Sequence, residues 1–279
     1  MSDLRVPDRR PAFSTLGASG EPLDQVVHLA RAAGLTGVEL RCAPDEPIHP
    51  GLTAEQVESV ARTLDAGWLS VLALSGYVRL CAPDDDFQLI ELTRQLTLAA
   101  AVGAAGVRVF MGDEDGTGEP RARRRLAAAA PQAARLGVRI LIETHDSHAE
   151  SRRLAGFIGT LDADTVRAVG VIWDTAHTWR HGESPARSLD LLAPYLAHLQ
   201  VKDVASDSDA TPVPLGSGRY PVRELGAALD AVRWRGWVCL EWERKWQPGL
   251  PPIREALERF PGWAAAVLGV AATGPEPRP

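Results

Sequence analysis

The sequence predicts an α/β protein built as a single closed (β/α)8 barrel, the TIM barrel architecture. The first observation is that short apolar runs of strand length alternate with amphipathic stretches of helix length along the whole chain. The second is their number, because eight such runs fit within the 279 residues. Parallel strands joined by right-handed crossovers, eight in number, favour a closed barrel over an open sheet. We expect one barrel domain over residues 1–270 and a disordered, proline-rich tail over 271–279.

Each expected strand is a short apolar run, rich in β-branched or aromatic residues. In chain order the strands are PAFSTLG (11–17), GVELRC (37–42), WLSVLALSG (68–76), GVRVFMG (106–112), VRILIETH (138–145), VGVIWDTAH (169–177), LAHLQVKDV (196–204) and WVCLEWE (237–243). The clearest helical stretches between them cover residues 22–34, 53–67, 87–106, 122–137 and 221–236. These five end on glycine, the usual residue after a helix C-terminus, and these glycines mark the approach to the next strand.

An open, doubly wound sheet is the alternative fold. Its nucleotide-binding form is disfavoured, because no G-x-G-x-x-G follows the first strand and no phosphate-binding G-x-x-x-x-G-K-[ST] occurs. The glycine-rich GDEDGTG after the fourth strand contains acidic residues that would repel phosphate. We interpret it as a loop.

The composition points to a small-molecule partner. A net charge of -6 and a pI near 5.7 argue against nucleic acid and anionic membranes, which reward clustered Lys and Arg. The first residues lack the apolar core of a secretory signal, and no stretch has the length of a membrane span. Three scattered cysteines, at positions 42, 81 and 239, suggest reduced thiols. We therefore expect a cytoplasmic protein.

Polar side chains collect at the ends of the last four expected strands, where a barrel of this type places its active site. In chain order these strand-end residues are Glu143, Asp174, Gln200 and Glu241. Because side chains alternate along a strand, each shares a face with the residue two positions earlier, and we expect all four to point inward. Three carboxylates this close would repel one another unless a cation lay among them. Oxygen ligands favour Mn²⁺ or Mg²⁺, with Co²⁺ or Zn²⁺ as alternatives.

Each acid also has a purely structural interpretation. An acidic residue at a strand end often caps the next helix, and Asp174 in DTAH is the clearest case. Glu143 and Glu241 are the hardest to explain in this way, because they directly follow the apolar ILI and VCL. Polar residues ending four successive strands favour a shared site.

Five more residues are expected to bind substrate near this cation: His145, His177, Lys202, Arg41 and Arg219. Their side chains would donate hydrogen bonds to hydroxyl, carbonyl or carboxylate groups. Lys202 and Arg219 could also be solvated loop residues, and Arg41 could form an ion pair at the barrel mouth. We interpret His198, two residues before Gln200, as a hydrogen-bonded core residue one layer deeper.

At these positions the sequence resembles the xylose isomerase-like barrel superfamily of sugar isomerases and epimerases. The matching segments run in family order: GVELR, LIETH, GVIWDTAHTWRHGESP, HLQVKD, PLGSGRYPV and GWVCLEWERKW. The resemblance implies that Glu143, Asp174 and Glu241 bind a divalent metal and that His177 contacts substrate. Family members usually have histidine at the position of Gln200, whose carbonyl oxygen can still be a ligand. The related apurinic endonucleases need further histidines at strands three and four, where this chain has ALSG and VFMG.

The resemblance implies a metal-dependent isomerase or epimerase that acts on a sugar or related polyol carbonyl compound through an enediolate, with Glu143 and Glu241 transferring the proton. One alternative is a lyase of the inosose or dehydroshikimate dehydratase type, favoured by Gln200 and by His145 in ETH. A second is a barrel that binds a ligand without catalysis. The expected partner is a carbohydrate-like small molecule, and self-association into a homo-oligomer is left open.

Overall fold

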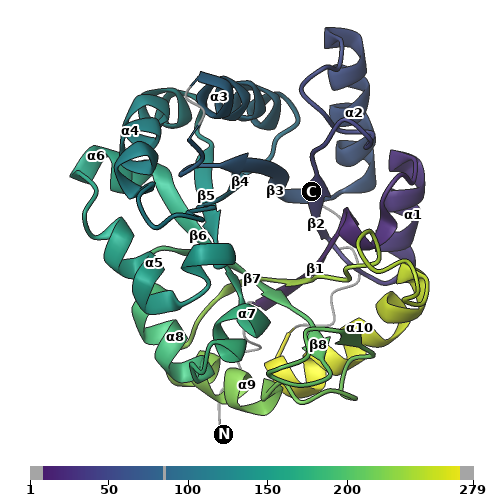
Figure 1. The fold of residues 1–279 in the computed structure, drawn as a ribbon. Coiled ribbons are helices and arrows are strands. Elements are labelled where there is room, and N and C mark those ends of the chain that lie inside the picture. The colour runs from purple at the N-terminus through teal and green to yellow at the C-terminus, as the bar shows by residue number, and fades with distance from the viewer. Residues whose placement is uncertain (1–8, 84–85, 271–279) are drawn as a thin grey trace, which may run out of the picture.

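Eight parallel strands close into one barrel (Figure 1). The computed structural model describes residues 9–83 and 86–270. In order around the barrel the strands are β1 (Arg9–Ser14), β2 (Gly37–Arg41), β3 (Ser70–Arg79), β4 (Gly106–Phe110), β5 (Arg139–Glu143), β6 (Val169–Asp174), β7 (Leu196–Val201) and β10 (Gly236–Leu240). Their spatial order follows the chain, and β10 pairs with β1 to close the ring. The predicted (β/α)8 barrel is confirmed.

The helices form an outer ring around the barrel (Figure 1). They are α1 (Leu23–Ala32), α2 (Ala54–Gly67), α3 (Asp86–Ala101), α4 (Glu119–Leu136), α5 (Ser151–Ile158), α6 (Ala163–Ala168), α7 (Thr175–Arg180), α8 (Pro185–Leu192), α9 (Val222–Ala231) and α10 (Ile253–Leu268), with short 3₁₀ turns η1 (Thr15–Ala18) and η2 (Asp146–His148). The expected helix over 87–106 ends earlier, at Ala101, because a turn with Gly103 at φ +73° separates it from β4. The expected tail, residues 271–279, lies outside the described residues.

Local sequence explains where several helices begin and end. Thr53 and Gln56 form a capping box at the start of α2, each side chain bonding the other's backbone N–H. Gly137 takes the left-handed conformation after α4 and turns the chain into β5.

No described helix is long and apolar enough to cross a membrane. The three cysteines are buried and unpaired, in agreement with the expectation of free thiols.

The barrel interior is filled with apolar side chains beneath the strand ends. One cluster joins Ala73, Leu141 and Ile172, and a second joins Ala12, Leu72 and Cys239 with Trp237 packed against it. The Trp237 ring lies so close to β2 that a side chain at Gly37 would have its Cβ 2.5 Å from a ring carbon. The inward faces predicted from strand alternation are therefore correct, and the apolar layers form the floor on which the polar strand ends rest.

We expect Leu141→Ala to lower the free energy of unfolding by about 2–5 kcal/mol, because it removes a buried side chain from the floor of the barrel. Urea denaturation measures this loss. Ile90→Ala on the exposed side of α3 is the control and should change stability by only about 0.5 kcal/mol. Equal losses in the two variants would contradict the assignment of Leu141 to the core.

Candidate active site

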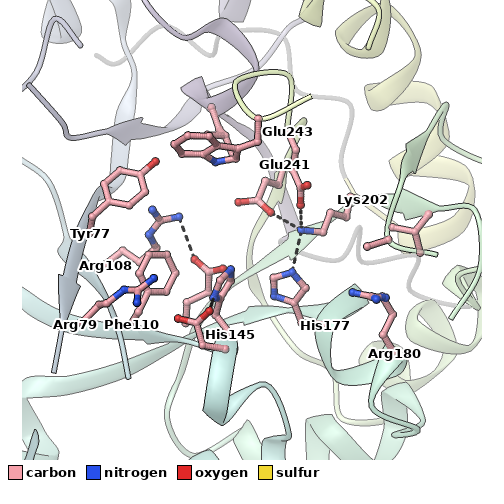
Figure 2. Close-up of a pocket in the computed structure, with 16 residues that line it drawn as sticks. Tyr77, Arg79, Arg108, Phe110, His145, His177, Arg180, Lys202, Glu241 and Glu243 are labelled. Atoms are coloured by element: carbon pink, nitrogen blue, oxygen red, sulfur yellow. Dashed lines mark hydrogen bonds and ion pairs between the residues drawn. The ribbon is translucent and has the colours of Figure 1, made fainter. Parts of the chain in front are cut away.

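A cavity of about 330 Å³ opens at the carboxyl end of the barrel (Figure 2). Polar groups line it from β4 and β5 and from the segments that follow β5, β6, β7 and β10: Arg108, Glu143, His145, His177, Lys202, Glu241 and Glu243. Three aromatic side chains also line it, those of Tyr77, Phe110 and Trp246. Its volume is at the lower end of the range for ligand sites, which is about 300–1,000 Å³. The cavity therefore fits a small molecule.

The ammonium of Lys202 lies among three carboxylates. Its Nζ is 2.7 Å from Asp174 Oδ2 and 2.7 Å from Glu241 Oε2. It also contacts Glu243, and Figure 2 shows Lys202 against Glu241 and Glu243. Burial alone would lower the pKa of Lys202, but the charges of Asp174, Glu241 and Glu243 outweigh it and raise the pKa well above its usual value. Lys202 therefore lies within the candidate site, and two of the predicted metal ligands, Asp174 and Glu241, share its single positive charge.

Asp174 has two roles that the sequence presented as alternatives. Its Oδ1 accepts hydrogen bonds from the backbone N–H of Ala176 and His177 and so caps α7. Its Oδ2 faces Lys202. Burial raises the pKa of Asp174 to about 6, although the Lys202 charge opposes the rise. One carboxylate therefore both anchors the helix and contributes charge to the site.

Glu143 is paired with a cation that sequence reasoning missed. Arg108 on β4 lies 3.1 Å from Glu143 Oε2, also donates to the backbone oxygen of Gly76, and stacks over the Phe110 ring. Burial raises the pKa of Glu143 to about 8, against the Arg108 charge and with a contribution from Glu241. The available signal was an arginine inside the apolar run GVRVF, on the inward face.

Two histidines complete the wall beside Glu143. The rings of His145 and His177 meet edge to face, with centroids 4.9 Å apart. His177 Nδ1 lies 2.9 Å from the Thr144 backbone oxygen and must donate to it, so Nε2 is the acceptor that faces Lys202 at 3.3 Å. Burial, reinforced by Lys202 and His145, lowers the pKa of His177 to about 3. His145 Nδ1 lies 2.6 Å from a carboxylate oxygen of Asp146.

Gln200 lies deeper than the residues that line the cavity. It is fully buried, and its Nε2 donates to both carboxylate oxygens of Glu39, at 3.0 and 3.1 Å. Its Oε1 has no hydrogen-bond partner among the described residues. His198, two residues earlier on β7, is also buried and is hydrogen-bonded to Glu39, which agrees with its interpretation as a core residue.

The two remaining predicted residues do not line the cavity. Arg41 forms ion pairs with Asp45 and Glu46 at the rim, and its guanidinium lies over the rings of Tyr77 and Trp246. The backbone N–H of Arg219 donates to Val204, within the turn that follows the short hairpin of β8 (Asp203–Val204) and β9 (Pro212–Val213). Substrate binding by either residue stays a prediction.

The donor set suits a divalent cation. Asp174 and Glu241 meet at the Lys202 ammonium, whereas Glu143 lies against Arg108. The carbonyl oxygen of Gln200 is buried without a partner among the described residues. Four buried carboxylates, Glu39, Glu143, Asp174 and Glu241, lie near the buried cations of Arg108 and Lys202, and Arg79 and Arg180 also line the cavity. Among the described His, Cys, Asp and Glu residues, the set whose ligand atoms all lie within 4.8 Å of one another is Glu143, His145 and His177, so the structure does not bring the three predicted carboxylates together as one such set. A cation held by Asp174 and Glu241 would have to displace the Lys202 ammonium.

Fold and site together define a (β/α)8 barrel with an acidic centre at its carboxyl end. The chain belongs to the xylose isomerase-like TIM barrel family, whose model it matches over residues 27–263. A comparison with curated proteins found no match.

Solved structures with this fold include enzymes of several reaction types. The probable 3-DHS dehydratase AsbF from Bacillus anthracis is 16% identical, with a TM-score of 0.71 over 90% of this chain and 98% of that chain. D-psicose 3-epimerase, solved in the presence of D-fructose, is 15% identical, with a TM-score of 0.76 over 93% and 99%. The IOLI protein with a bound zinc atom is 17% identical, with a TM-score of 0.76 over 93% and 98%. At these identities the likeness shows the fold alone.

We expect Lys202→Met to lower the free energy of unfolding by about 3–5 kcal/mol in metal-free buffer, because it leaves buried carboxylates without their cation. Urea denaturation measures the loss, and added Mn²⁺ should restore part of the lost stability by binding the uncompensated carboxylates. Arg79→Met is the control, since its partner Glu114 is exposed and the pair contributes less than about 1 kcal/mol. A Lys202 variant as stable as the Arg79 variant would contradict the assigned role of the ammonium.

Proposed function

We propose that this protein is a divalent-metal-dependent isomerase or epimerase acting on a sugar or a related polyol carbonyl compound. The observation that carries the proposal is the placement of two buried carboxylates across a small cavity. Glu143 ends β5 and Glu241 follows β10, and β6 and β7 separate these strands on the shorter side of the ring. A substrate between them would meet one carboxylate on each face.

The cation would be held by Glu143, Asp174, Gln200 and Glu241, and this oxygen-rich set favours Mn²⁺ or Mg²⁺. When bound, it would stabilise the negative charge that develops on the substrate's carbonyl and neighbouring hydroxyl oxygens. If His145 and His177 took part, their nitrogen donors would shift the preference toward Zn²⁺ or Co²⁺.

The protein's own groups would move the proton. One of Glu143 and Glu241 would remove the proton from the carbon beside the carbonyl, and the other would return a proton to the enediolate. Lys202 lies within reach of both Glu241 and His177 and can donate to a substrate oxygen once it leaves the carboxylates. Tyr77, Phe110 and Trp246 supply an aromatic wall against which the carbon face of a sugar can pack.

A dehydratase is the second candidate, and the pair of His145 and Asp146 favours it. The carboxylate of Asp146 raises the pKa of His145 despite its burial, and the imidazole lies beside Glu143 on the cavity wall. Such a histidine can remove the proton next to the carbonyl. The substrate then expels hydroxide from the β-carbon, a C=C bond forms, and the hydroxide takes a proton to leave as water.

We expect Glu143→Gln and Glu241→Gln each to reduce turnover by at least about 100-fold, because a carboxamide cannot exchange a proton. Turnover is measured with a panel of free ketoses and with 3-dehydroshikimate, in the presence of Mn²⁺. Glu58→Gln, on the exposed side of α2, is the control and should keep full activity, because neither Glu58 nor its partner Arg62 lines the cavity. Full activity in both site variants would refute the assignment.

Product analysis in D₂O separates the candidate reactions. Isomerisation or epimerisation leaves the mass unchanged apart from one incorporated deuterium, whereas dehydration lowers the mass by one water. A chain that neither binds Mn²⁺ nor gains thermal stability from it would instead favour a barrel that binds its ligand without catalysis.

A further inference from the structure

A buried carboxylate on β2 controls the layer directly beneath the cavity. Glu39 has no solvent exposure and accepts hydrogen bonds from Gln200 Nε2, from His198 Nε2 at 3.1 Å, and from the Ser75 hydroxyl. All of these groups act as donors, so Glu39 is purely an acceptor here.

This arrangement determines which end of the Gln200 carboxamide faces which way. A carboxylate can be faced only by the NH₂ end, because the carbonyl end would bring two acceptors together. The carbonyl Oε1 is therefore turned away from Glu39, where no described residue donates to it. Leaving such a buried acceptor unpaired costs about 1–3 kcal/mol. A hydrogen-bond donor or a cation bound to Gln200 Oε1 would remove this cost.

The strand register places Gln200 at the level of the predicted metal ligands. Gln200 is the register partner of Asp174 on β6 and of Cys239 on β10, two residues before Glu241. Asp174 and Glu241 are the two carboxylates joined by Lys202. The unpartnered carbonyl therefore belongs to a residue flanked by the strands that supply two predicted ligands.

We propose that Glu39 is a positioning residue that fixes the Gln200 carboxamide with its carbonyl oxygen as a ligand of the divalent cation; this inference rests on the metal-dependent function proposed above. The chemistry explains why a glutamine needs such a partner. An imidazole at this position would have a nitrogen on either side, whereas a carboxamide has only one end that can bind a cation.

A double-mutant cycle tests the proposal with Mn²⁺ as the probe and isothermal titration calorimetry as the readout. The four chains are the wild type, Glu39→Gln, Gln200→His and the double variant. With Gln200 present, Glu39→Gln lets the amide turn over and should weaken Mn²⁺ binding by about 10-fold or more. With histidine at position 200, the oxygen of the introduced amide can still accept the imidazole N–H, so the same change should weaken binding by less than about 3-fold. The Glu39 charge is lost both with glutamine and with histidine at position 200. The difference between the two losses of Mn²⁺ affinity therefore reports the orientation of the Gln200 carboxamide.

Two further variants separate the orientation of the amide from the charge of Glu39 and from the loss of any one hydrogen bond. Glu39→Asp keeps the charge but shortens the side chain, and it should weaken Mn²⁺ binding as Glu39→Gln does. Ser75→Ala removes a different hydrogen bond to Glu39 and should leave the affinity within about 3-fold of the wild type. Thermal unfolding of every variant confirms that it is folded.

The outcomes are distinguishable. If Glu39→Gln costs the same Mn²⁺ affinity in the wild-type chain and in the Gln200→His variant, Glu39 acts through its charge alone, which overturns the proposal while the metal-dependent function stands. A wild-type chain that does not bind Mn²⁺ overturns both. A Gln200→Ala variant that binds Mn²⁺ as tightly as the wild type also overturns the proposal, because the carbonyl would then not be a ligand.

Discussion

The burial of four carboxylates at the carboxyl end of the barrel is the constraint on which the site depends. Carboxylates removed from water are costly unless cations and hydrogen bonds compensate them. The chain meets this need by extending Lys202 among Asp174 and Glu241 and by placing Arg108 against Glu143. These pairs hold the carboxylates in place, and the proposed binding of a cation by Asp174 and Glu241 would require Lys202 to move away from them.

The barrel supplies rigid support for this charge. Apolar side chains around Leu141 and Ile172 fill part of the interior. A polar group centred on Glu39 lies beside them, because the strand register pairs Glu39 with Ala73 and His198 with Ile172. Asp174 shows how closely support and site are joined, because one of its oxygens caps α7 while the other meets Lys202. The site thus lies on strand ends whose positions the closed barrel determines. The aromatic residues at the rim and the loops after the strands surround it.

Family membership limits the chemistry without selecting one reaction. Structures with this fold are described as epimerases, a dehydratase and a zinc-binding protein, all at 18% identity or less. In the proposed function, the choice among reactions depends on a few groups beside the buried carboxylates. In this chain those groups include the His145 and Asp146 pair, the Arg108 guanidinium and the buried Gln200.

The barrel could be predicted from the amino-acid sequence, because alternating strand and helix periodicity is a local property of the chain. The inward face of Glu143 and Asp174 could be predicted in the same way, since strand alternation has a period of two residues. Only the tertiary structure shows which residues contact these buried groups. Arg108 stands 35 positions before Glu143, and Glu39 stands 161 positions before Gln200, and no local pattern links residues so distant in the chain. Closure of the ring brings them together, and contacts of that kind determine charge balance and amide orientation.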